Sequence, residues 1–114
     1  MSTSINTKTI TRLLITNRGE IAIRIMQSAQ KLGIHCIALY SDADRNALHV
    51  KKADEAWFIG PSPAKDSYLV VEKILEVAKQ SNADAVHPGY GFLSENAEFA
   101  QAIMDAGMAW VGPP

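Results

Sequence analysis

The sequence predicts an α/β domain of the parallel, doubly wound type: a Rossmann-like sheet of about five strands with helices on both faces. Short and nearly continuous apolar runs recur through the chain, which is typical of strands buried on both faces. Segments with helical spacing separate these runs, and the connections are too short for anything but crossovers. The 114 residues, 47% of them apolar and 20% charged, suffice for one globular domain with a buried core.

The chain begins with a strand, a helix and a second strand. The apolar runs RLLIT and IHCIALY predict strands at residues 12–16 and 34–40. Between them, residues 19–33 have the spacing of an amphipathic helix that ends at a glycine. Asn17, with Glu20 three positions later, is a near variant of the capping box and marks the start of this helix. The side chains expected on its buried face are Ala22, Ile25, Met26, Ala29 and Leu32.

The rest of the chain repeats this alternation. Further strands are expected at residues 55–59, 83–87 and 108–112, and further helices at 45–52, 68–81 and 94–107. The buried side chains expected on the last two helices are Val71, Ile74, Leu75, Ala78, Phe99, Ala100, Ile103 and Met104. Ser94 is the expected N-cap of the last helix, where Glu95 and Glu98 favour the helix dipole. The first nine residues are expected to be frayed, and residues 10–114 form the domain.

Composition excludes several functions. The net charge of −1 and the lack of a Lys/Arg cluster argue against a nucleic-acid partner. No apolar stretch approaches the ~20 residues of a membrane-spanning helix, and the polar start has no signal-peptide core. A single cysteine, Cys36, is expected to be buried and cannot form an internal disulfide. We expect a cytoplasmic protein, or a mitochondrial matrix protein in a eukaryote.

Functional residues are expected in the loops that follow the strands. In doubly wound sheets ligands bind at the carboxyl ends of the strands. Three loops qualify: TNRGE at 16–20, SDADRN at 41–46 and HPGYGFLSEN at 87–96. The last could be a phosphate cradle, a lip beside a substrate or only a tight turn.

The usual nucleotide and catalytic motifs are absent from these loops. The first has one glycine beside the bulky Arg18, whereas a dinucleotide fingerprint needs three. Asp42 occupies the place of a ribose-binding acid, but a role as a cap or turn former explains it better. No Gly-Lys-Ser/Thr run follows a strand, and no nucleophile has a base beside it. The chain has three histidines, His35, His49 and His87. Their spacing is not that of metal ligands, so we expect no metal site.

Several runs together resemble one family closely. They are TNRGEIAIRI, YSDADRNALHVKKADEAWFIGPSP, SYL, AVHPGYGFLSENAEFA and VGPP, and they span almost the whole chain. They are similar to the N-terminal, pre-ATP-grasp domain of biotin carboxylase, as found in acyl-CoA carboxylases and pyruvate carboxylases. The run YSDADRNALHV resembles most the α subunits of 3-methylcrotonyl-CoA carboxylases.

This resemblance implies part of an ATP-dependent ligase. In the family, bicarbonate is activated by ATP, and the carboxyl group passes to biotin on a carrier domain. ATP and magnesium are bound by an ATP-grasp domain further along the chain, so the 114 residues alone are expected to be inactive. The implied partners are that domain, the biotin carboxyl carrier domain, a carboxyltransferase subunit and a second copy in a homodimer. The final acceptor, an acyl-CoA or pyruvate, stays open.

The resemblance also assigns roles to single residues. In HPGYGFLSEN, Tyr90, Gly91 and His87 would lie on the biotin side, with the Tyr90 ring against the biotin rings. Phe92 is expected to face the core. Arg18 and Glu20 would have an interdomain or cleft role, although pairing and capping explain them too. The dimer-face candidates are Arg24, Gln27 and Lys31, where Gln27 and Lys31 differ from the dimeric bacterial enzyme.

Two other functions remain as alternatives. One is a stand-alone nucleotide-binding module that uses the same strand ends. The other is a structural domain whose helices dock onto another domain or subunit. Binding of ATP or NAD to the isolated chain would favour the first.

Overall fold

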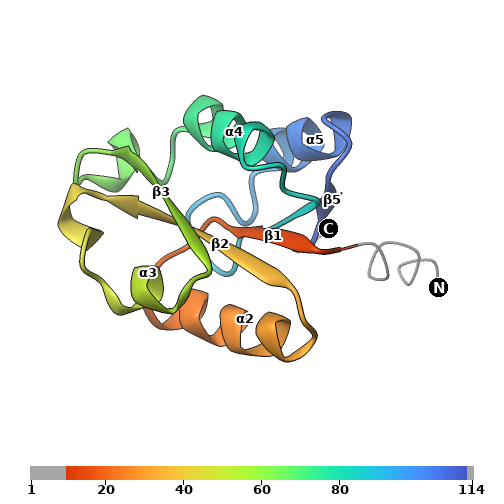
Figure 1. Ribbon diagram of the computed structural model, residues 1–114. Coiled ribbons are helices and arrows are strands. Elements are labelled where there is room, and N and C mark those ends of the chain that lie inside the picture. The colour runs from red at the N-terminus through yellow and green to blue at the C-terminus, as the bar shows by residue number, and fades with distance from the viewer. Residues whose placement is uncertain (1–9, 113–114) are drawn as a thin grey trace.

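Five short strands form a single parallel sheet in the computed structural model, which describes residues 10–112. The strands are β1 (Arg12–Ile15), β2 (His35–Ser41), β3 (Glu55–Gly60), β4 (Ala85–His87) and β5 (Ala109–Trp110). The helices are α2 (Gly19–Lys31), α3 (Leu48–Lys52), α4 (Val71–Gln80) and α5 (Ala97–Asp105), with 3-10 turns at Asp42–Asp44 and Ala64–Asp66. The expected parallel, doubly wound α/β fold is confirmed (Figure 1).

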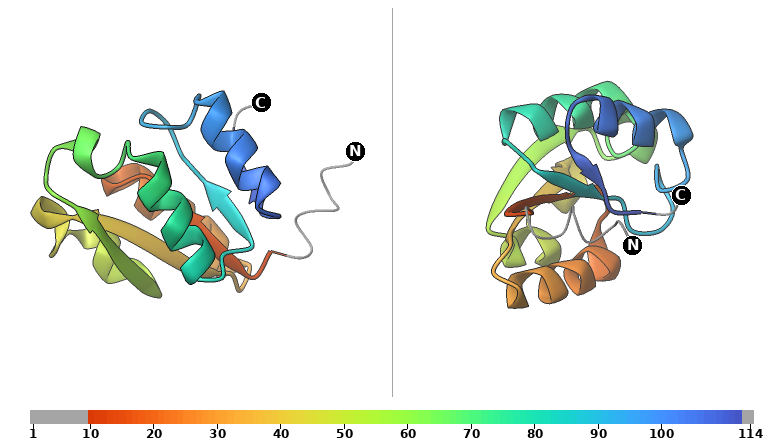
Figure 2. Two further views of the ribbon diagram at one scale, coloured as in Figure 1. Left: turned by 90° about the horizontal axis from the view of Figure 1, so that it is seen from above. Right: turned by 90° about the vertical axis from the view of Figure 1, so that its right-hand side faces the viewer.

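The apolar strand residues alternate between two cores, one on each face of the sheet. Leu14 and Ile37 pack on the face covered by α4 and α5. Leu13, Ile15 and Cys36 pack on the face covered by α2 and α3. Figure 2 shows the three layers edge-on, with the sheet between the two helix pairs. Burial on both faces explains why the strand sequences are continuous apolar runs instead of alternating ones.

The strand order is β3-β2-β1-β4-β5, so the chain reverses direction across the sheet between β1 and β4. β1 pairs with β2 on one side and with β4 on the other. The loops that leave β1 and β4 therefore start next to each other, although about 70 residues separate them in sequence. Crevices at such reversal points are the usual ligand sites of open α/β sheets.

The last helix begins later than the sequence predicts. α5 starts at Ala97, and Asn96 Oδ1 accepts a hydrogen bond from Phe99 N at 2.9 Å. The assignment of Ser94 as N-cap is therefore wrong. Ser94 is buried within a turn instead, where its N–H donates to Gly91 O at 2.9 Å. Both residue types are good caps, so the sequence alone did not separate them.

Two side chains that were expected in the core are exposed. Leu32 is 78% exposed because α2 ends at Lys31 and Leu32 is its C-cap. Met104 is 48% exposed, since α5 buries Phe99 and Ile103 and the next residue points about 100° away. α4 likewise begins at Val71 instead of residue 68.

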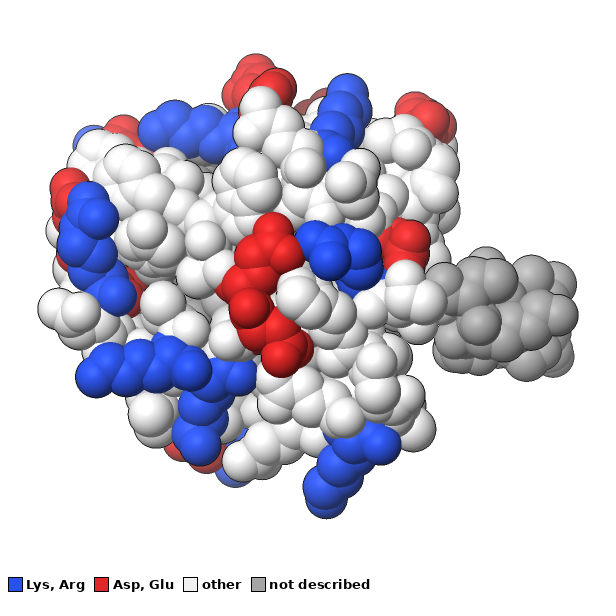
Figure 3. Space-filling view, viewed as in Figure 1, with Lys and Arg blue, Asp and Glu red and all other residues white. Residues whose placement is uncertain are grey.

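The surface carries mixed charge. Lys and Arg side chains alternate with Asp and Glu over the face drawn in Figure 3, without an extended area of one sign. Among residues 10–112, no helix combines the length and the apolar character that a bilayer crossing demands.

Candidate functional site

The loop after β1 holds the loop after β4 through one amide side chain. Asn17 is 4% exposed, and its Nδ2 donates to Pro88 O at 2.8 Å and to Tyr90 O. Its Oδ1 accepts from Arg18 N at 2.8 Å. Both ends of the amide are thus used, and Asn17 does not cap α2 as the sequence predicted. The N-cap of α2 is Arg18, which makes no side-chain cap hydrogen bond.

The tight contact between these loops requires a glycine at position 89. Gly89 has φ +68, a conformation that disfavours residues with a side chain. A Cβ there would lie 2.8 Å from Ile21 Cγ2 and 3.1 Å from Asn17 Nδ2. The first glycine of PGYG is therefore needed for close approach of the backbone to α2.

Tyr90 and Gly91 form the open tip of the same loop. The Tyr90 side chain is 79% exposed, although its backbone carbonyl is tied to Asn17. Gly91 has φ +70, and a Cβ there would meet no atom within 4 Å. The loop thus presents an aromatic ring and bare backbone to the outside. This combination fits a flat, partly apolar ring.

Phe92 anchors the far side of the loop on a buried aromatic residue. Its ring stacks on that of Tyr68, with ring centres 5.1 Å apart and planes 5° from parallel. Phe92 adopts φ +47, a strained backbone that the stacking contact helps to hold. One face of the Phe92 ring thus packs on Tyr68, but Phe92 as a whole is 36% exposed, so the expectation that it faces the core is wrong.

Tyr68 continues this contact to an acidic residue in the loop after β2. Tyr68 Oη donates to Asp44 Oδ2 at 2.7 Å and accepts from Ser41 N at 3.3 Å. Burial raises the pKa of Tyr68, and the Asp44 carboxylate raises it further. The phenol is therefore a permanent donor near neutral pH.

Asp44 forms a two-point ion pair with Arg18. Arg18 Nε lies 2.6 Å from Asp44 Oδ2, and Arg18 Nη2 lies 2.6 Å from Asp44 Oδ1. The Arg18 hydrogen bonds lower the pKa of Asp44 to about 2, burial opposes this, and the Tyr68 phenol adds to the lowering. The pKa of Arg18 is raised by the same bonds. Arg18 is thus used to join the first two loops, and Glu20 pairs instead with Arg24 on the surface, at 3.5 Å.

The two histidines nearest to these loops shape the backbone. His87 Nδ1 accepts from Gly89 N at 3.1 Å, and burial lowers the pKa of His87, which favours the neutral ring. His49 is buried; its Nδ1 accepts from Gly19 N at 3.4 Å and its Nε2 donates to Leu39 O at 2.9 Å. His49 therefore satisfies an N–H group of the first turn of α2.

Some sequence candidates lie away from this cluster. Arg24, Gln27 and Lys31 are exposed on α2. Asp42 pairs with Arg45 at 2.9 Å on the surface. No group of three or more His, Cys, Asp or Glu within residues 10–112 is arranged to hold a metal ion.

Asp44 and Tyr68 were not identified as site residues from the sequence. Asp44 is one of two acids in SDAD, and nothing in that run distinguishes the buried one from the exposed one. Tyr68 was assigned to the start of a helix, whereas it precedes α4 and points into the core. The burial of the Tyr68 phenol beside the end of a strand would have marked it as a site residue. That burial depends on tertiary contacts, which the sequence does not show.

Comparison with known proteins finds one family. The family described as "Biotin carboxylase, N-terminal domain" matches residues 9–114. The α subunit of mitochondrial methylcrotonoyl-CoA carboxylase from Mus musculus is 57% identical over 105 residues, 92% of this chain and 15% of that protein. The biotin carboxylase of Halalkalibacterium halodurans is 59% identical over 102 residues, 90% of this chain and 23% of that protein. The chain thus spans less than a quarter of these relatives.

Solved structures agree with the sequence comparison. The urea carboxylase of Kluyveromyces lactis superposes with a TM-score of 0.89 at 43% identity, over 91% of this chain and 9% of that chain. The pyruvate carboxylase of Rhizobium etli gives a TM-score of 0.85 at 44% identity, over 91% of this chain and 11% of that chain. Carboxylases named for different substrates, urea and pyruvate, therefore share this domain.

Proposed function

Because this chain belongs to the biotin carboxylase N-terminal domain family, we propose that it forms one wall of the biotin site in an ATP-dependent biotin carboxylase. The observation that supports this role most is the exposed ring of Tyr90 on a loop whose backbone is fixed from below. An exposed aromatic residue is normally mobile, and ordering it on binding would cost entropy. Here Asn17 and the Phe92–Tyr68 stack already hold the loop.

The residues present fit the bicyclic ring system of biotin. The Tyr90 ring offers a flat apolar face, and the missing side chain at Gly91 lets a ligand approach the backbone. His87, held neutral by burial, completes this side of the site as a positioning residue for the turn. Arg18 acts through Asp44 and keeps the first two loops in place beside the loop of Tyr90.

The chemical step belongs to residues outside this chain. In the proposed enzyme, ATP activates bicarbonate on a downstream ATP-grasp domain that also binds magnesium. A carrier domain would bring biotin to the loop of Tyr90, and a carboxyltransferase subunit would pass the carboxyl group on to the final acceptor, an acyl-CoA or pyruvate. Residues 10–112 contribute shape and stacking to this reaction and provide no acidic cluster for the metal.

The proposal is tested by Tyr90→Ala in a full-length enzyme that contains this domain, with Tyr90→Phe as the matched control. Loss of the ring should raise the KM for biotin several-fold and leave the KM for ATP unchanged. The phenylalanine variant keeps the flat face and should behave like the parent. Equal changes in both KM values for Tyr90→Ala would contradict the proposal, because they would point to general destabilisation.

A second measurement concerns the chain by itself. The 114 residues should show no bicarbonate-dependent hydrolysis of ATP at concentrations at which a full-length enzyme is active. Measurable ATP hydrolysis by the purified chain would contradict the proposal that the chemical step belongs to residues outside this chain.

A further inference from the structure

The backbone of Phe92 is held in a conformation that residues with a side chain rarely adopt. Its φ is +47, and Asn82 is the only other non-glycine residue with a positive φ in the described part of the chain. Burial does not account for this strain, because Phe92 is 36% exposed. Strained residues of this kind persist where their surroundings hold them, and they gather at ligand-binding loops.

The Tyr68 ring is a fixed platform for Phe92. It is 1% exposed, and the two rings are 5° from parallel with their centres 5.1 Å apart. Tyr68 Oη donates to Asp44 Oδ2 at 2.7 Å, and Asp44 is itself buried and paired with Arg18. A hydrogen bond at the phenol end and packing around the ring therefore fix both its position and its tilt.

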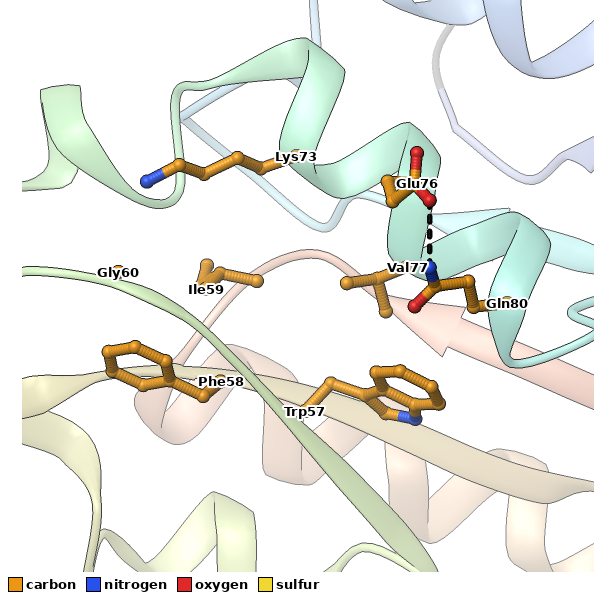
Figure 4. Close-up of a pocket in the computed structure, with 8 residues that line it drawn as sticks. All are labelled: Trp57, Phe58, Ile59, Gly60, Lys73, Glu76, Val77 and Gln80. Atoms are coloured by element: carbon orange, nitrogen blue, oxygen red, sulfur yellow. Dashed lines mark hydrogen bonds between the residues drawn. The ribbon is translucent and has the colours of Figure 1, made fainter.

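The segment between β3 and α4 that carries Tyr68 is also tied down. Ser67 Oγ donates to Pro63 O at 3.0 Å within the segment. Lys73 Nζ donates to Asp66 O at 3.0 Å and thereby joins α4 to the segment. Figure 4 shows the Lys73 side chain extending from α4 toward the end of β3, at one end of a groove of about 340 Å³ between them. Tyr68 is therefore held through its backbone as well as through its side chain.

The tip of the Tyr90 loop is supported from two sides. On the side of β4, Asn17 binds the Tyr90 carbonyl oxygen. On the far side, the stacked ring of Phe92 holds the chain. Between them Gly91 has φ +70, and a Cβ there would meet no atom within 4 Å. Asn17 thus fixes the backbone that enters the tip, and Phe92 fixes the direction in which the chain leaves it.

We propose that Phe92 and Tyr68 are positioning residues that set the orientation of the Tyr90 ring for biotin. This inference rests on the proposed function, in which the Tyr90 ring meets biotin. Tyr68 and Asp44 are buried, so they act on the ligand only through the Phe92 ring. A loop that is ordered before binding loses less conformational entropy when the ligand arrives, so breaking the stack should weaken biotin binding.

The kinetic test uses a full-length enzyme that contains this domain. Phe92→Leu keeps an apolar side chain but removes the flat ring, and the KM for biotin should rise about fivefold, the size expected for ordering one side chain on binding. The KM for ATP should stay unchanged. Phe92→Tyr retains the stacked ring and should keep the KM of the parent. Ile103→Val, which removes a methyl group from the core that contains Tyr68, should lower stability without changing either KM.

A second substitution separates positioning from direct contact with biotin. Tyr68→Leu removes the platform at a buried position, and it should raise the KM for biotin as Phe92→Leu does. The double variant should bind biotin no worse than either single variant, because the stack is already lost in each; independent effects would multiply instead. If only Phe92→Leu raised the KM for biotin, Phe92 would touch biotin itself, and the proposal would be overturned.

NMR order parameters of the 114-residue chain give a readout that needs neither biotin nor ATP. In Phe92→Leu they should fall at residues 91 and 92 and stay constant at Gly89, which lies on the side of the loop that Asn17 holds. This measurement does not depend on whether Tyr68→Leu folds. Unchanged order parameters at residues 91 and 92 would overturn the positioning role.

Tyr90→Ala distinguishes a failure of this inference from a failure of the proposed function. If Tyr90→Ala leaves the KM for biotin unchanged, the proposed function is wrong and the inference with it. If Tyr90→Ala raises this KM and Phe92→Leu does not, only the positioning role is wrong. Equal rises in the KM values for biotin and ATP in Phe92→Leu would also overturn the positioning role, because they would indicate a general loss of structure.

Discussion

The phenol of Tyr68 lies 2.7 Å from the Asp44 carboxylate, and the face of the same ring stacks on Phe92. One buried side chain thus connects the loop after β2 with the loop after β4. Arg18, from the loop after β1, holds the other side of Asp44. The three loops at the carboxyl ends of the strands are therefore a single connected unit, and the exposed Tyr90 is at its tip.

Removing only the hydroxyl group of Tyr68 measures the polar part of this connection. Tyr68→Phe keeps the stack on Phe92 but leaves Asp44 Oδ2 and Ser41 N each with one partner fewer. The free energy of unfolding should fall by about 1–2 kcal/mol, the usual result for buried groups that lose a hydrogen bond. Urea unfolding measures it. Unchanged stability would mean that the Tyr68–Asp44 bond contributes nothing beyond packing.

Asn17 should be the main determinant of order in the Tyr90 loop. Asn17→Ala leaves Pro88 O and Tyr90 O without their donor, and the loss should be roughly 2–3 kcal/mol. Hydrogen exchange in the loop should accelerate as well. Asn96→Ala is the control, because it removes one cap bond from α5 and should cost about 1 kcal/mol without changing exchange in the loop. The same exchange pattern in both variants would contradict this role.

The two glycines of PGYG should respond differently to alanine. Both have positive φ, so either substitution adds backbone strain of about 1 kcal/mol. A Cβ on Gly89 also meets Ile21 and Asn17, whereas one on Gly91 meets nothing. Gly89→Ala should therefore cost roughly 2–4 kcal/mol in total and Gly91→Ala about 1 kcal/mol. Thermal unfolding of both variants decides this, and equal losses would show that the loops do not touch as described.

The fold could be predicted from the sequence because its signal is local. Each apolar run and each helical period lies within one element, so the parallel sheet with helices on both faces follows from their alternation. The strand order does not follow, because it depends on which strands pair. The contact between Asn17 and the loop of Tyr90 exists only because β4 lies beside β1. From the sequence alone, Asn17 was therefore interpreted as a helix cap, which is the commonest local role of an asparagine at the start of a helix.

Within the candidate site, the exposed and the buried residues differ in how well the sequence identifies them. Tyr90 and Gly91 stand in a distinctive motif, and both are exposed; their ligand-facing role stays a prediction. Asp44 and Tyr68 are 24 residues apart and meet only in the folded chain. Their pairing selects one acid of SDAD for burial and leaves Asp42 on the surface, a distinction without any local signal.

The Arg18–Asp44 pair should make the free energy of unfolding depend on pH in the acidic range. The Arg18 hydrogen bonds hold the pKa of Asp44 at about 2 in the folded chain, below its ordinary value of 3.8. A carboxylate with a lowered folded pKa contributes stability that is fully present above the ordinary value and is lost as the pH falls through the folded value. The contribution near neutral pH should be about 2 kcal/mol.

Burial raises the pKa of Glu55, but hydrogen bonds from Trp57, His35 and Arg12 outweigh it and bring this pKa to about 2. Because the parent and Asp44→Asn share this effect of Glu55, it cancels in their difference, which isolates the contribution of Asp44. The difference in unfolding free energy between parent and variant should be constant near neutral pH. It should shrink by about 2 kcal/mol between about pH 4 and about pH 2, as the parent takes up the proton on Asp44. Urea unfolding across this range measures the difference. If it stayed the same at every pH, the ion pair would not be the source of the low pKa of Asp44.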